Sequence, residues 1–265
     1  MNLQALFNLP PQQAIKYLES KGYQVTWDWY ELMGSAHTRA FTVAKATSRN
    51  VLEAFLNELK KALQDGLTFD QFRRNIQPRL VEMGWWGKKE VLDGMTGELT
   101  TATLGTYNRL RTIFQTNMQT AYMAARYQRF EDNKNDRPYL AYIAVEDGRT
   151  RPEHWELYKK LRGKVIHIDD PIWDVIFPPN GWGCRCRTMA LSLDEVRRLG
   201  LQIVKSLGTE FVPVVLNKDG DMAQVQSVSL MGNDGKPFWF RPDPGWDYNP
   251  GKRPLADLAD ELLQA

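Results

Sequence analysis

The hydrophobic pattern of this chain changes near residue 136, and this change constrains the fold more than any other feature. Before that point, apolar residues recur every three or four positions, which is the period of a helix with one buried face. After it, apolar residues alternate over short runs separated by Gly and Pro, which is typical of strands and turns. The sequence therefore predicts an α+β fold, with a helical N-terminal part, a small mixed α/β motif domain and a strand-rich, Pro- and Trp-rich tail.

The spacing of apolar residues predicts helices at about 12–20, 31–64 (one long helix or a pair), 69–80 and 103–130. Thr68 is a favourable N-cap residue for the third of these helices. The Asp-Gly pair at Asp93 predicts a turn, and hence an exposed hairpin near 88–101. We therefore expect a mainly helical region over residues 1–136.

The rest of the chain divides into two further regions, the motif domain at 137–200 and a strand-rich extension at 201–265. Ser192 is expected to cap a short helix that ends at Arg198. A last short helix is expected at 255–263. The predicted strands lie at about 139–145, 164–168, 185–189, 211–216 and 225–230.

The charge of the chain is nearly balanced, with 34 Lys and Arg against 32 Asp and Glu in 265 residues. This balance gives no whole-chain reason to expect binding to nucleic acid or to a membrane surface. No apolar run approaches the roughly 20 residues of a membrane-spanning helix, so no membrane partner is expected. Four arginines on one predicted helix are candidates for contact with DNA phosphates, although a solvated helix face is the commoner explanation: Arg109, Arg111, Arg126 and Arg129.

The two cysteines, Cys184 and Cys186, are separated by one residue. A disulfide between them would be strained, so they are expected to be reduced thiols or metal ligands. Thiolate and imidazole groups suit zinc, which makes His154 a candidate ligand, with Asp147, His167 or water in the fourth position. The alternative is that His154 packs locally and both cysteines are small buried thiols.

The usual catalytic signatures are missing from the sequence. The His-x-Glu and Pro-Cys-x-x-Cys pattern of nucleobase deaminases is absent, as are a phosphate-binding Walker loop and a Gly-x-Ser-x-Gly turn. We therefore assign no catalytic residue and expect no small-molecule substrate. The alternative is a metal-dependent, hydrolase-like enzyme that uses His154, Cys184 and Cys186.

The motif domain contains a distinctive series of residues in a fixed order: Asp147, Arg149, Thr150, His154, Gly163, Pro178, Pro179, Cys184, Arg185 and Cys186. In this order the chain resembles the phage Mu F-type head morphogenesis proteins, also called minor capsid proteins. Similar segments at 84–90 and 242–245 extend the resemblance over nearly the whole chain. Many relatives carry Cys where this chain has Arg151.

The resemblance implies a minor structural protein of the head of a tailed phage or prophage, and not an enzyme. Such a protein acts in head morphogenesis by associating with the portal protein and the procapsid interior. Capsid or scaffold proteins are further partners, and DNA is a candidate partner during packaging or delivery. The implied location is the virion, in the head interior or at the portal vertex, and the host cytoplasm during assembly.

Overall fold

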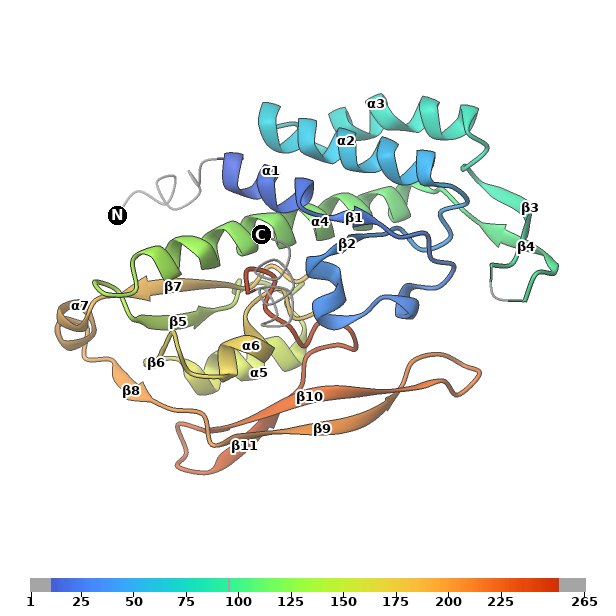
Figure 1. Cartoon of the computed structure of the whole chain (residues 1–265). Helices are drawn as coiled ribbons and strands as arrows, with labels where there is room; N and C mark the ends of the chain where they lie inside the picture. The colour runs from blue at the N-terminus through green and yellow to red at the C-terminus, as the bar shows by residue number, and fades with distance from the viewer. Residues whose placement is uncertain (1–10, 95, 253–265) are drawn as a thin grey trace, which may run out of the picture. The chain divides into compact units, whose positions relative to one another are not determined.

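The computed structural model describes residues 11–94 and 96–252 of the chain, which divides into two compact units, residues 1–125 and 126–265 (Figure 1). Helices and strands occur in both units, which confirms the predicted α+β class. The division into three regions at 136 and 200 is finer than these two units and stays a prediction. The expected helix at 255–263 lies outside the described residues.

The first unit is mainly helical. Strands β1 and β2 form a short parallel pair, and β3 and β4 form an antiparallel hairpin. This hairpin is the one predicted near 88–101. Helix α4 begins in this unit and ends in the second. The elements are α1 (Pro11–Glu19), β1 (Gly22–Tyr23), η2 (Trp29–Glu31), η3 (Gly34–Thr38), β2 (Ala40–Phe41), α2 (Arg49–Asp65), α3 (Phe69–Glu82), β3 (Lys88–Leu92), β4 (Leu99–Thr103) and α4 (Tyr107–Asp132).

The predicted helix at 31–64 is wrong in its first half. Only α2 is α-helical there. The residues before it include the short 3-10 helices η2 and η3 and strand β2. Phe41 and Val43 are both buried while Thr42 between them is less so, which is the alternation of a strand and not of a helix. The predicted cap of α3 is confirmed, because the Thr68 side chain accepts a hydrogen bond from the backbone N–H of Gln71.

Trp85 is fully buried in the hydrophobic core of the first unit. Its indole Nε1 donates to the carbonyl oxygen of Lys45 at 2.7 Å, and its ring meets Phe55 of α2 edge-on at 5.2 Å. The guanidinium group of Arg109 lies over the same ring at 5.1 Å. One side chain thus joins the segment after α3 to α2, to the loop before α2 and to the start of α4.

The second unit holds two sheets. A four-stranded sheet has the order β7-β5-β6-β8, in which only β6 and β8 pair in parallel. In Figure 1, β9 and β10 form a long antiparallel ribbon, and β11 pairs with the other edge of β10. The elements are β5 (Tyr139–Ile143), α5 (Pro152–Leu161), β6 (Lys164–His167), α6 (Ile172–Ile176), β7 (Arg187–Leu191), α7 (Leu193–Arg198), β8 (Gln202–Val204), β9 (Gly208–Val215), β10 (Met222–Met231) and β11 (Pro237–Phe240).

The core of the second unit lies between these strands and the helices that follow them. Leu140 of β5 and Val165 of β6 are fully buried in the four-stranded sheet, and Trp173 of α6 is almost completely buried. Ser192 caps α7 as predicted, because its hydroxyl oxygen accepts from the backbone N–H of Glu195. Among the described residues, no helix has both the length and the apolar character needed to cross a bilayer.

Replacement of Trp85 is expected to destabilise the first unit strongly. Trp85→Ala should lower the free energy of unfolding by about 3–5 kcal/mol, because it leaves a large cavity. Trp85→Phe keeps most of the packing but leaves the Lys45 carbonyl without its donor, at a cost of about 1–3 kcal/mol. Denaturant unfolding measures both values. The exposed Val81→Ala on α3 is the control, and it should change the stability by less than about 0.5 kcal/mol.

Candidate functional site

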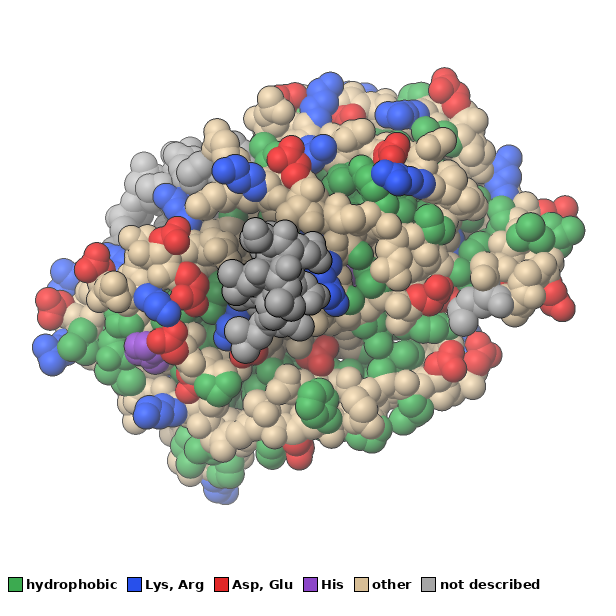
Figure 2. Space-filling model, in the orientation of Figure 1, with side chains coloured by type: hydrophobic (Ala, Val, Ile, Leu, Met, Phe, Trp, Pro, Cys, Tyr) green, Lys and Arg blue, Asp and Glu red, His purple; other side chains and the backbone are tan. Residues whose placement is uncertain are grey.

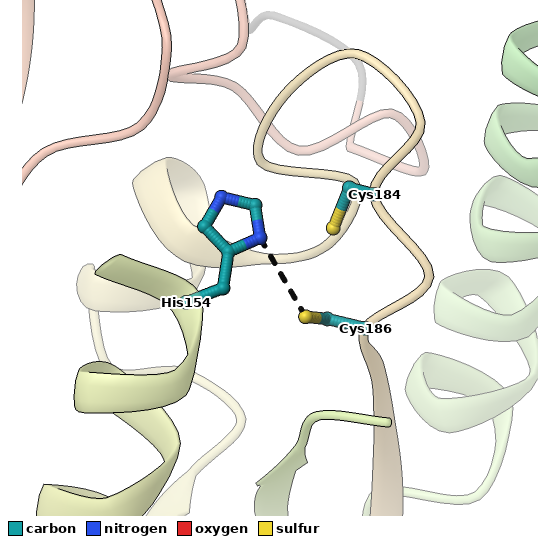
Figure 3. Close-up of side chains that lie close together, drawn as sticks. All are labelled: His154, Cys184 and Cys186. Carbon is teal, nitrogen blue, oxygen red and sulfur yellow. Dashed lines mark hydrogen bonds between the residues drawn. The ribbon is translucent and has the colours of Figure 1, made fainter. Parts of the chain in front are cut away.

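His154, Cys184 and Cys186 come together in the second unit and form a buried cluster. His154 lies in the first turn of α5, and the two cysteines lie in the loop that leads into β7. Figure 3 shows the imidazole ring facing the two thiols across the gap between helix and loop. His154 Nδ1 is 3.7 Å from Cys186 Sγ, and one ligand atom from each of the three residues lies within 4.8 Å of the others. Their exposed fractions are 4%, 6% and 2%, respectively.

Local sequence explains why these side chains meet. Pro152 occupies the start of α5, where its fixed φ and missing N–H favour a helix beginning, so His154 falls in the first turn. The loop turns at Gly183, whose φ of 68° lies in the left-handed region that favours glycine. The backbone N–H of Cys184 donates to the Gly181 carbonyl at 3.1 Å across this turn.

The two thiols of the cluster are not equivalent. A hydrogen bond with Cys186 holds the pKa of Cys184 well below its usual range, against the effect of burial, and His154 acts in the same direction. The same hydrogen bond, together with burial, raises the pKa of Cys186. The hydrogen bond between the two thiols therefore helps one of them to ionise while it holds the proton on the other. The set can act as a pair of metal ligands with the imidazole, or as a thiolate next to a histidine.

Two further candidate ligands from the sequence analysis have other partners. Arg185 donates to both carboxylate oxygens of Asp147, at 2.8 and 2.5 Å, and holds the pKa of Asp147 well below its usual range. His167 accepts a hydrogen bond from the Asp169 backbone N–H at 3.2 Å and faces the ring of Tyr139 edge-on. Neither residue belongs to the cluster of His154 and the two cysteines, as far as the described part of the chain shows.

Arg151, just before α5, links the motif to the tail of the chain. Its guanidinium group pairs with Asp243 and donates to the Trp182 carbonyl at 3.0 Å. The Asp243 backbone N–H in turn donates to the Asn180 carbonyl at 3.0 Å. In the same region, Trp246 packs edge-on against Trp182. The Pro- and Trp-rich tail therefore covers the loop that carries the cysteines.

Sequence reasoning missed several residues that surround the cluster. Tyr142 and Asn180 are both buried, and the Tyr142 hydroxyl donates to Asn180 Oδ1 at 2.9 Å. Phe240 of β11 meets the His154 ring edge-on at 6.1 Å. Asn180 stands in a Pro-Pro-Asn-Gly run, which is a signal for a turn, but nothing in the sequence connects it to a tyrosine 38 residues away.

The remaining motif residues shape the backbone around the site. Thr150 donates from its hydroxyl to the Val145 carbonyl, which closes the turn after β5. Arg149 pairs with Asp147 at 3.4 Å from a well-exposed position. Gly163 has a φ of 81° between α5 and β6, and the peptide bond between Pro178 and Pro179 is cis.

The four candidate DNA-contacting arginines all lie on α4 but differ in their surroundings. Arg109 donates to the carbonyl oxygens of Thr103 and Leu104, at 2.9 and 2.8 Å. Arg126 donates to the Thr188 carbonyl at 3.0 Å. Arg111 is exposed and Arg129 is half-buried. Two of the four side chains thus make contacts within their own units.

A family model described as Phage Mu protein F like protein matches residues 53–189, which is more than half of the chain. The chain belongs to this family. In this Mu F-like chain, the matched residues include the motif from Asp147 to Cys186. No solved structure matches the chain significantly.

Two curated relatives are similar over most of the chain. One, from Escherichia phage Mu, is named "Putative capsid assembly protein F" and is 42% identical over 246 residues, which cover 92% of this chain and 54% of the relative. The other, the "Mu-like prophage FluMu F protein" of Haemophilus influenzae, is 41% identical over 231 residues, which cover 86% of this chain and 53% of the relative. The chain therefore spans about half the length of these relatives.

A matched pair of glycine variants tests the close packing around Arg151. A Cβ atom at Gly181 would overlap the Arg151 guanidinium and the Asp243 carboxylate, whereas one at Gly148 meets nothing within 4 Å. Gly181→Ala is therefore expected to cost about 1–3 kcal/mol of stability through overpacking. Gly148→Ala should stay within about 0.5 kcal/mol of the original chain. Equal thermal unfolding of the two variants would contradict this packing.

Proposed function

We propose that this chain is a minor structural protein of a phage or prophage head, which acts in head morphogenesis by associating with the portal protein and the procapsid interior. The observation that carries this proposal is the family membership, together with the capsid assembly role in the name of the phage Mu relative. Capsid or scaffold proteins are further partners in the proposal. The corresponding location is the virion head, and the host cytoplasm during assembly.

The charged side chains of the motif are paired with one another or with the tail, which supports a structural role over an enzymatic one. Asp147 is paired with Arg185, and Arg151 is paired with Asp243. His154 and the two cysteines are buried. A hydrolase-like enzyme would need such groups to reach a substrate, whereas here they join segments of the same unit. We therefore propose that the chain is not an enzyme.

The surface offers apolar residues for contact with head proteins. Phe211 of β9 is 65% exposed, and Val215 and Met222 are also exposed. Val215 and Met222 are directly opposite each other in the β9–β10 register, and Phe211 lies four residues from Val215, so all three share one face of the ribbon. Figure 2 shows hydrophobic side chains along this ribbon and at the end of the β3–β4 hairpin. Exposed apolar patches of this kind favour protein interfaces.

DNA contact is a second part of the proposal and rests on fewer residues. Because Arg109 and Arg126 donate to backbone carbonyls, contact with phosphates would fall mainly to Arg111 and Arg129. Binding through such side chains should weaken steeply as the salt concentration rises.

The proposal is tested with a phage or prophage that carries this gene. Phe211→Ser is expected to weaken capture of the portal protein by the purified chain at least about tenfold, because an exposed aromatic anchor is lost. Glu210→Ser is the matched control, since Glu210 is the exposed neighbour of Phe211 on the other face of β9, and it should bind normally. The same variants should rank in the same order in the yield of filled heads.

Two outcomes would contradict the proposed role. Deletion of the gene with a normal yield of infectious heads would exclude a role in head morphogenesis. Capture of the portal protein by Phe211→Ser and Glu210→Ser with the same affinity would exclude the β9–β10 face as the contact surface.

A further inference from the structure

We propose that His154 Nδ1 and the thiolates of Cys184 and Cys186 bind one Zn²⁺ ion, with a water molecule or a small anion in the fourth position. The ion would join the first turn of α5 to the loop before β7. This inference does not depend on the role in head assembly, because it concerns residues that the proposed partner contacts do not use.

The spacing of the donor atoms fits zinc. With bonds of about 2.3 Å to sulfur and about 2.0 Å to nitrogen, tetrahedral geometry places a sulfur and a nitrogen ligand about 3.5 Å apart. The observed distance between His154 Nδ1 and Cys186 Sγ is 3.7 Å. All three donor atoms lie within 4.8 Å of one another, so shifts of about 1 Å complete the arrangement.

The type of donor selects the metal. Thiolate sulfur and imidazole nitrogen favour zinc, whereas magnesium and calcium require oxygen ligands. Asp147, the carboxylate among the motif residues, is held by Arg185 and Arg149. The cluster therefore offers two sulfur atoms and one nitrogen atom, with no carboxylate oxygen among the described residues.

The surroundings of the thiols match those of metal-bound thiolates, which are stabilised by neighbouring donors. The backbone of Asn180 makes a hydrogen bond to Cys184, and the Tyr142 hydroxyl interacts with Cys186. These two contacts come from different segments, the Pro-Pro-Asn-Gly turn and strand β5.

A buried amide group gives a second, independent indication of a ligand. Asn180 is fully buried, and its Nδ2 atom has no hydrogen-bond partner among the residues that the structure describes, although its Oδ1 accepts from Tyr142. An unpaired buried donor is costly, so it is normally paired with an acceptor. Tyr142 contacts both Asn180 and Cys186, so Asn180 belongs to the same buried group as the cluster.

The first experiment uses the full chain, purified without an affinity tag under reducing conditions. Elemental analysis should find about one zinc ion per chain. After removal of the metal by a chelator, titration with Co²⁺ should give the absorption of a tetrahedral site with sulfur ligands. Re-addition of Zn²⁺ should raise the unfolding temperature, because the ion binds the folded chain. These measurements require no variant.

Variants then identify the ligands. His154→Ala, Cys184→Ser and Cys186→Ser should each weaken zinc binding by more than the roughly 10–100-fold loss that follows removal of an outer partner. His167→Ala and Asp147→Asn are the controls, and both should keep one zinc ion per chain. Because Asp147 was a candidate ligand in the sequence analysis, its variant also tests the ligand set directly.

Three results would overturn the inference. One is a chain with fully reduced thiols that carries no zinc and whose unfolding temperature does not respond to Zn²⁺. Another is a Co²⁺ spectrum without sulfur ligation. The last is zinc that stays bound to folded His154→Ala and Cys186→Ser chains but is lost from His167→Ala.

Discussion

Arg151 joins three parts of the second unit, because its guanidinium group ties its own segment to two others. It stands just before α5, pairs with Asp243 in the tail and donates to the Trp182 carbonyl in the cysteine-bearing loop. The planar fork of an arginine can engage two acceptors at once, which the single ammonium group of a lysine does less well. Gly181 lies against this pair so closely that a side chain there would displace it. The position of the loop relative to α5 therefore depends on this contact.

The other contacts of the motif depend on the position of the cysteine-bearing loop. With the loop against α5, Arg185 reaches Asp147, and the two cysteines face His154 on the buried side. The motif then consists of an ionic contact at the surface and a sulfur–imidazole cluster beneath it. Both join segments that are distant in sequence. This is the construction expected of a small domain that must keep its shape while it is bound by larger partners, and it agrees with the proposed role in a phage head.

The sequence was sufficient to predict the fold class, and it named as candidate ligands three residues that the structure places together. Residue type alone limits the thiol and imidazole candidates to two cysteines and three histidines, and both His154 and His167 were kept as candidate ligands. It could not separate Asp147 from these ligands, because a carboxylate suits a metal and an arginine equally well. Nor could it find the pair of Arg151 and Asp243, whose members are 92 residues apart.

Errors in the helical half have a similar origin. The apolar residues at 41–44 fit a helical pattern when they are counted together with those of α2, although Phe41 and Val43 alternate as in a strand. Helical periodicity also places Arg109 on a polar face, whereas its partners are backbone carbonyls and the ring of Trp85. Periodicity reports which face is apolar, and it does not report which polar side chains fold back onto the protein.

The contact between Arg151 and Asp243 holds the cysteine-bearing loop in place. Hydrogen–deuterium exchange of an Asp243→Asn chain tests it most directly, with Glu210→Gln as the control. We predict faster exchange in peptides that cover both 180–186 and 243–249, because the amides of Cys184, Asp243 and Trp246 donate within these two segments. Exchange at 180–186 that is unchanged from the original chain would contradict the claim.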